Sequence, residues 1–258
     1  MIKTVILHHL PDMNDLPAAE RWFYRYHIPE VLRGAPSTTR YVSYRAVSPP
    51  PGAESLGYYN YKVHENWSLV EGRDGSRGFL SMTPEVVPLD VIMVNVPDRP
   101  TEDFMGKELT LDEKTILRWL IIFKYPEGVP VEEGEDWYLN VHAKEVMRQS
   151  GIIRFFSYRI LPSNLNIPTS SNTPTSVRSF LHPKSRCTSN WHRVSEQWYE
   201  NNNGWVKSII DSPPKYTRPP WAKYDKYPFL EPFVDFASTF ILERPTDDWL
   251  RNVPPFYI

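Results

Sequence analysis

The segment ERWFYRYHIPEVLRG, residues 20–34, occurs a second time in the chain as EDWYLNVHAKEVMRQ, residues 135–149. Matching positions are 115 residues apart throughout the segment. A period of that size indicates a duplicated domain, because solenoid repeats are roughly 20 to 50 residues long. The identical pairs are Glu20 and Glu135, Trp22 and Trp137, His27 and His142, Glu30 and Glu145, Val31 and Val146, and Arg33 and Arg148.

The bulk properties are those of a globular protein with two domains of ordinary size. The chain has 258 residues, 41% of them apolar, and a formal net charge of −2 without runs of like charge. Neither a nucleic acid nor a membrane is therefore an expected partner. Residues 1–12 are too poor in apolar positions for a signal peptide, and the single Cys187 fits a reducing compartment. We expect a cytoplasmic protein.

Each half contains the same succession of predicted elements: strand, helix, strand, strand, helix, strand. In the first half the strands are residues 2–10, 40–47, 63–67 and 90–96, with helices beginning near Pro17 and at residues 69–80. In the second half the strands are residues 117–125, 154–161, 194–198 and 235–242, with helices near residues 132–149 and 201–210. The strand at residues 2–10 is β-branched and apolar, which predicts burial on both faces.

The first helix carries an apolar stripe that includes Trp22 and His27, so both His27 and its copy His142 are expected on the buried side. Pro29 lacks a backbone N–H and should bend or end this helix near His27. Lys144 stands at the matching position, so the two halves should differ there.

The duplication covers nearly the whole chain. We expect a first repeat at residues 1–104, a linker at 105–116, a second repeat at 117–249 and a tail at 250–258. The second repeat carries two insertions, at about residues 162–190 and 212–232. The first is rich in Ser, Thr, Asn and Pro, and the second is rich in Pro, Tyr, Trp and Lys.

This order of elements predicts an α+β fold made of tandem ferredoxin-like βαββαβ repeats. One four-stranded antiparallel sheet covered by helices on one side leaves a bare apolar face. Two copies in one chain can bury these faces against each other and form an intramolecular dimeric α+β barrel. The protein would be a monomer that is a pseudo-dimer, or a homodimer.

The segment WFYRYHIPEVLRGAPSTTRYVSYRA, residues 22–46, resembles the opening helix and second strand of the EthD-like family of the dimeric α+β barrel superfamily. His27, Pro29 and Val31 match the family's His-Ala-Pro-Leu-Val signature. In the second half His142 and Val146 match, while Lys144 departs from the pattern. The resemblance implies the barrel fold. Because the family includes enzymes that decarboxylate or dehydrate aromatic polyketides, it also suggests chemistry on aromatic compounds.

His27 and His142 are the first catalytic candidates, since an imidazole can accept or donate a proton near neutral pH. Glu30 and Glu145, three residues further on, could fix the tautomer of each histidine. The alternative is a structural histidine that tethers the helix end in both halves. We favour His27, because Pro29 makes its surroundings special.

Glu65 and Glu196 are the second pair, because strand alternation places each with Val and Trp on one face. Burial would raise the pKa of such a carboxyl into the range of a general acid. The alternative is a salt bridge that holds the sheet. Its expected partners are Arg40, Arg45, Arg154 and Arg159.

Tyr44 and Tyr158 could orient a phenolic or carbonyl oxygen of the substrate, and His8 or His9 could serve as a base inside the barrel. Strand phase does not say which of the two histidines faces inward. The insertion at residues 216–229 would be a lid that excludes water. Further substrate-binding candidates are Trp22, Tyr24, Trp67, Trp198, Tyr216 and Trp221.

No metal site is expected, because each half has only one His-x-x-Glu pair, on an outer helix. No glycine-rich phosphate loop occurs, so we expect no cofactor. Haem stays open, since related barrels bind it through histidine. The leading hypothesis is a cofactor-independent lyase that acts on a small aromatic or phenolic molecule by acid/base chemistry in a barrel cavity, with dehydration, hydration or decarboxylation as the reaction. The alternatives are a cofactor-free monooxygenase of phenols and a non-catalytic small-molecule-binding or stress-response protein.

Overall fold

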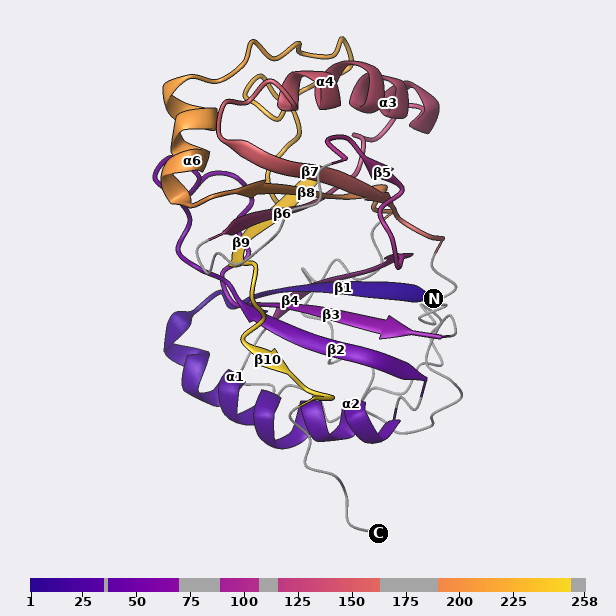
Figure 1. The fold of residues 1–258 in the computed structure, drawn as a ribbon, viewed down its shortest axis with the longest axis vertical. Helices are drawn as coiled ribbons and strands as arrows, with labels where there is room; N and C mark the ends of the chain where they lie inside the picture. Colours follow the sequence, from indigo (N-terminus) through magenta and orange to yellow (C-terminus); the bar gives the residue numbers. More distant parts are fainter. Residues whose placement is uncertain (35–36, 70–88, 107–115, 163–189, 252–258) are drawn as a thin grey trace.

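The computed structural model contains two antiparallel sheets that face each other, each covered by helices on its outer side (Figure 1). It describes residues 1–34, 37–69, 89–106, 116–162 and 190–251. The predicted helix at 69–80, most of the linker, most of the insertion at 162–190 and most of the C-terminal tail lie outside these ranges. The fold is therefore α+β, with two ferredoxin-like halves forming one barrel, as the sequence predicts.

The first sheet has the strand order β10-β2-β3-β1-β4, and the second has the matching order β5-β7-β8-β6-β9. All pairings between the strands of each sheet are antiparallel. The long strands of the first sheet are β1 (Ile2–His9), β2 (Thr38–Arg45), β3 (Lys62–Ser68) and β4 (Asp90–Pro97). Those of the second are β6 (Leu117–Phe123), β7 (Ile152–Arg159), β8 (Arg193–Tyr199) and β9 (Phe236–Leu242).

The two short strands exchange between the halves. β5 (Glu102–Asp103) follows the first sheet in sequence but pairs with β7 of the second. β10 (Asp247–Asp248) follows the second sheet but pairs with β2 of the first. Thr101 and Thr246 anchor the two crossings, because each hydroxyl accepts a bond from a strand-end amide, at 2.8 and 2.9 Å. Each half therefore completes the edge of the other.

The helix after β1 is a 3₁₀ turn (η1, Met13–Asp15), α1 (Leu16–Trp22), a π-helical turn (η2, Phe23–His27) and α2 (Ile28–Gly34). Its counterpart is α3 (Val131–Trp137), a π-helical turn (η3, Tyr138–His142) and α4 (Ala143–Val146). In the second half, α6 (Asn202–Val206) and a third π-helical turn (η4, Lys207–Asp211) follow β8.

The prediction that Pro29 makes the two halves unequal is wrong. In both halves a π-helical turn ends at the histidine and the helix continues beyond it. The N–H of Ile28 bonds to the carbonyl of Phe23, and that of Ala143 to the carbonyl of Tyr138. The wide turn thus forms with and without a proline after it, so Pro29 is accommodated by it rather than causing it.

Apolar side chains fill three layers, one between the sheets and one beneath each set of helices. β6 is buried on both faces, whereas Ile2, Thr4 and Ile6 of β1 keep partial exposure, so the predicted two-sided burial holds fully only in the second half. In the part of the chain that the structure describes, no helix is long and apolar enough to cross a membrane.

Candidate functional site

The predicted site residues lie on opposite faces of the sheets and do not form one site. The tyrosines, glutamates and two tryptophans of the prediction lie between the sheets, and they are Tyr44, Tyr158, Glu65, Glu196, Trp67 and Trp198. The two helix histidines, His8 of β1 and the remaining aromatic residues lie on the outer faces, and they are His27, His142, His8, Trp22, Tyr24, Tyr216 and Trp221. Histidine and glutamate therefore cannot act on the same substrate atom.

The centre of the inner layer is a buried ionic cluster formed by two pairs of equivalent residues. Arg118 Nη2 lies 2.7 Å from a Glu196 oxygen and 3.1 Å from a Glu65 oxygen. Lys3 Nζ lies 3.5 and 3.7 Å from the same two carboxylates. Tyr44 donates to Glu65 at 3.1 Å, and the Lys3 ammonium lies 3.9 Å from the centre of the Tyr158 ring.

This cluster lowers the pKa of Glu65 instead of raising it. Burial raises the pKa of Glu65, but attraction to Lys3 and Arg118 outweighs it and lowers that pKa to about 2. The expected rise into the range of a general acid is therefore reversed. The ion-pair partners are Lys3 and Arg118 rather than the strand arginines of the sequence interpretation. Arg40 stacks on Trp67 instead, and Arg45 and Arg159 pair with Glu20 and Glu135.

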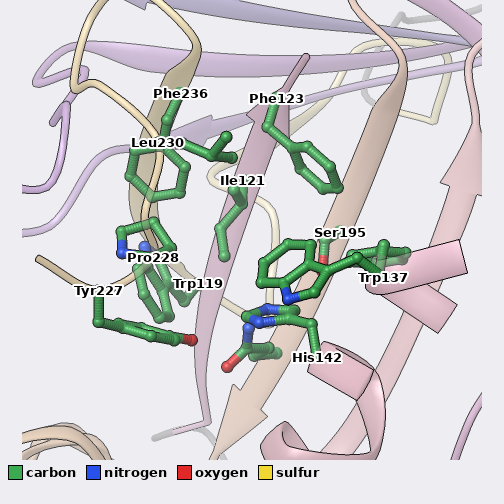
Figure 2. A pocket seen from close by; sticks show the side chains of 12 residues that line it. Trp119, Ile121, Phe123, Trp137, His142, Ser195, Tyr227, Pro228, Leu230 and Phe236 are labelled. Carbon is green, nitrogen blue, oxygen red and sulfur yellow. The ribbon is translucent and has the colours of Figure 1, made fainter. Parts of the chain in front are cut away.

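A pocket lies on the outer face of the second sheet, between β6, β8, the α3–α4 helix and the segment 212–232 (Figure 2). The cavity volume inside the pocket is about 20 Å³. The walls are largely aromatic, and His142, Ser195 and Gln197 add polar groups. The lining residues are Trp119, Ile121, Phe123, Trp137, Tyr138, His142, Ser195, Gln197, Tyr227, Pro228, Leu230 and Phe236.

His142 ends the π-helical turn η3 and points into this pocket (Figure 2). Its ring centre lies 4.8 Å from that of Trp137 and 5.8 Å from that of Tyr227. The Nδ1 atom is buried and has no hydrogen-bond partner among the described residues. Burial lowers the pKa of His142 to about 3, so the imidazole is neutral near neutral pH.

The segment 212–232 contributes Tyr227, Pro228 and Leu230 to the pocket wall, and its role as a lid stays a prediction. Tyr216 and Tyr227 stack at 4.0 Å, and Trp221 packs edge-on against Trp137 at 5.3 Å. Glu145, predicted to fix the tautomer of His142, instead accepts two hydrogen bonds from Thr217 of this segment.

The corresponding region of the first half is a histidine cluster. His8 and His64 have ring centres 4.7 Å apart, and Phe23 lies between His64 and His27, at 4.7 and 5.5 Å. Burial lowers the pKa of His8 to about 3 and that of His64 well below its usual value. Among the described residues, no group of three potential ligands could hold a metal ion.

His9 lies on the opposite face of β1 from His8, beside Tyr59 and Phe233. Its pKa is lowered, chiefly by burial. Tyr24 donates to Asp247 at 3.2 Å and so fixes the exchanged strand β10. Neither residue lines the pocket.

Ser195 and Gln197 line the pocket but were not among the predicted site residues. They flank Glu196 in the VSEQW segment. Because neighbouring strand residues point to opposite faces, a glutamate between the sheets places both of them on the side of His142. Strand alternation could have identified Ser195 and Gln197 as pocket residues once the side chain of Glu196 was known to point between the sheets.

A protein of solved structure shares the fold of this chain at low sequence identity. A family model for the chalcone isomerase N-terminal domain matches residues 1–97, and no curated protein matches the chain. A solved anthrone oxidase-like protein is similar over 96% of this chain and 92% of its own, with a TM-score of 0.53 and 9% identity. A candidate monooxygenase from Lactobacillus acidophilus NCFM gives a TM-score of 0.34 at 10% identity, covering 93% and 92% of the two chains.

At this level of identity the similarity to the anthrone oxidase-like protein establishes a shared fold. The class that fold and topology define is an α+β barrel of two facing antiparallel sheets, here within one chain. The EthD-like resemblance of residues 22–46 stays a prediction.

Proposed function

We propose that this protein is an enzyme that binds a small, flat aromatic or phenolic molecule in the pocket beside His142 and moves a proton to or from it. The observation that carries the proposal is the buried Nδ1 atom of His142, which faces an aromatic pocket and has no hydrogen-bond partner in the part of the chain that the structure describes. A buried polar atom without a partner is costly, so a ligand hydroxyl that bonds to it would be recognised selectively.

The low pKa of His142 defines its role. At neutral pH the imidazole is neutral and can accept a hydrogen bond, and its low pKa makes it a weak base until a substrate is bound. Transfer of a phenolic proton would leave an imidazolium beside a phenolate, and their attraction would offset the burial that disfavours the charged ring. Gln197 and Ser195 supply further hydrogen-bonding groups on the β8 wall for orienting the substrate.

The reaction that we favour is of the lyase type, in which proton transfer accompanies loss or addition of water or carbon dioxide. The second candidate is cofactor-free oxygenation, in which the deprotonated aromatic ring reacts with dioxygen. We keep oxygenation as a candidate because the chain shares its fold with an anthrone oxidase-like protein. The two reactions differ in a simple observable, because oxygenation consumes dioxygen and the lyase reaction does not.

We assign the base to His142 rather than to His27, because the pocket found among the described residues opens beside His142. Glu65, Glu196, Tyr44 and Tyr158 are then scaffold, since the two carboxylates pair with Lys3 and Arg118, Tyr44 donates to Glu65, and the Tyr158 ring lies against the Lys3 ammonium.

The test compares His142→Phe with His27→Phe, using 2-naphthol for binding and, for turnover, a hydroxynaphthoic acid for the lyase reaction and anthrone for oxygenation. We expect His142→Phe to weaken 2-naphthol binding about tenfold and to lower turnover by about 10² or more, the usual contribution of a positioned base. His27→Phe should change both by less than about threefold. Full turnover by His142→Phe of a substrate that the wild type converts would refute the assignment. An oxygen electrode decides between the two reactions.

A further inference from the structure

The segment 212–232 closes the pocket too tightly for an aromatic ligand. Tyr227, Pro228 and Leu230 form one wall, and the room left inside is about 20 Å³. An apolar cavity that takes up benzene measures about 150 Å³. A flat aromatic molecule therefore enters only if this segment moves.

One contact fixes the segment to the helix that carries His142. Glu145 on α4 accepts bonds from the Thr217 amide at 2.9 Å and from its hydroxyl at 2.6 Å. Trp137 of α3 donates its indole N–H to the Thr217 carbonyl at 3.2 Å. All three polar groups of one exposed residue are thus bound to the α3–α4 helix. Hydrogen bonds to a carboxylate are stronger than neutral ones, so Glu145 is the main attachment.

The remaining polar attachment to this helix end is weaker. Gln149 donates to the Tyr216 hydroxyl at 2.9 Å, a bond between neutral groups. Arg218 pairs with Asp225, which belongs to the same segment and cannot hold it to the helix. The other contacts are apolar: Ala222, Phe229 and Leu230 are buried in the core beneath the helices, and Tyr216, Trp221 and Tyr227 make ring contacts with Trp137 and His142.

We propose that Glu145 and Thr217 form a latch that keeps segment 212–232 closed over the pocket, and that a flat aromatic ligand enters when this latch opens. The identity of the ligand rests on the proposed function, whereas the latch itself does not. The entering ring would take up the apolar contacts beside Trp137 and His142 that Tyr227 and the other side chains of the segment now fill.

The latch is tested without any ligand by limited trypsin digestion of the folded protein. Lys215, Lys223 and Lys226 are cleavage sites inside the segment. Glu145→Gln and Thr217→Val should each accelerate cleavage there about tenfold, because proteolysis follows the population of the open form. Thr217→Ser keeps the hydroxyl group and should be cleaved at the wild-type rate. Glu133→Gln removes one negative charge from an exposed position of α3, so it serves as the control and should leave the cleavage rate unchanged.

Urea unfolding of each variant checks that only the segment, and not the whole fold, has loosened. Unchanged cleavage rates in both latch variants would overturn the proposal. The association rate of 2-naphthol, followed by tryptophan fluorescence, tests the second part: it should rise severalfold in the latch variants. Faster cleavage with an unchanged association rate would overturn the gating role. If the wild type binds no 2-naphthol, the proposed function fails, and trypsin alone decides on the latch.

Discussion

At the scale of single residues, the charges at the centre of the molecule show how the inner layer is held together. Lys3 and Arg118 are 115 positions apart and occupy equivalent places in β1 and β6. With Glu65 and Glu196 they form a neutral set of two cations and two anions between the sheets. Such a set is stable only when every member keeps its partners, so the inner layer is a packed core.

Replacing Glu196 by Gln should therefore destabilise the protein strongly. The change leaves Arg118 and Lys3 buried with only one carboxylate between them, and breaking a buried pair costs about 3 to 5 kcal/mol. Urea unfolding at pH 7 measures the loss, with the exposed Glu133→Gln as the control, for which less than about 0.5 kcal/mol is expected. A loss below about 1 kcal/mol for Glu196→Gln would contradict the structural role of the cluster.

The sequence predicted which residues share a face but not which face points inward. Alternation correctly grouped Glu65 with Val63 and Trp67, because it depends only on local strand geometry. The pairing of Glu65 with Arg118 depends on contact between two sheets, which local patterns do not contain. For the same reason, the separation of Glu65 from His27 by the sheet was not predictable.

At the scale of elements, the π-helical turns determine where the histidines lie. An extra residue in one turn shifts the phase of the helix, so that Trp137, Tyr138 and His142 all face β6 and β8. The same turn recurs at residues 23–27. The 3.6-residue pattern located the helix, but the π turn depends on packing against the sheet.

Lys144→Pro should be tolerated unusually well for a proline inside a helix. Pro29 already occupies the matching place after the π turn of the first half. We expect a loss of about 1 kcal/mol, compared with about 3 kcal/mol or more for an ordinary interior position. Asp136→Pro, an exposed change in the regular α3 helix, provides that comparison in urea unfolding. Equal losses at the two positions would show that the π turn leaves no room for the ring.

At the scale of the whole molecule, the two halves share a scaffold and differ in their outer layers. The strand exchange was not predictable from the repeat of DRPTEDF and ERPTDDW, because a repeated segment does not reveal which sheet it joins. On the outer faces, His8 and His64 of the first half stand where the second half has Phe123 and Ser195. The halves thus differ at these positions beneath the helices, while the inner layer keeps the pairs Glu65 and Glu196, Tyr44 and Tyr158, and Trp67 and Trp198.

The buried neutral histidines should make the fold sensitive to mild acid. In the unfolded chain a histidine binds its proton below about pH 6.5, whereas folded His8 and His142 resist protonation until about pH 3, and the pKa of His64 is also lowered. The unfolded state therefore binds more protons between these values. The stabilisation is complete above pH 6.5 and is lost progressively as the pH falls towards 3, by up to about 1.4 kcal/mol per pH unit for each histidine.

Urea unfolding at a series of pH values from 7.5 to 4.5 measures this slope, and His8→Phe isolates one contribution. Phenylalanine is the residue of the second half at this position, Phe123, where it is buried beneath the helix. The variant should lose about 1.4 kcal/mol per pH unit of the slope below pH 6 while remaining folded at pH 7.5. A slope identical to that of the wild type would mean that His8 already binds its proton in the folded protein, and that burial does not hold the histidine cluster neutral.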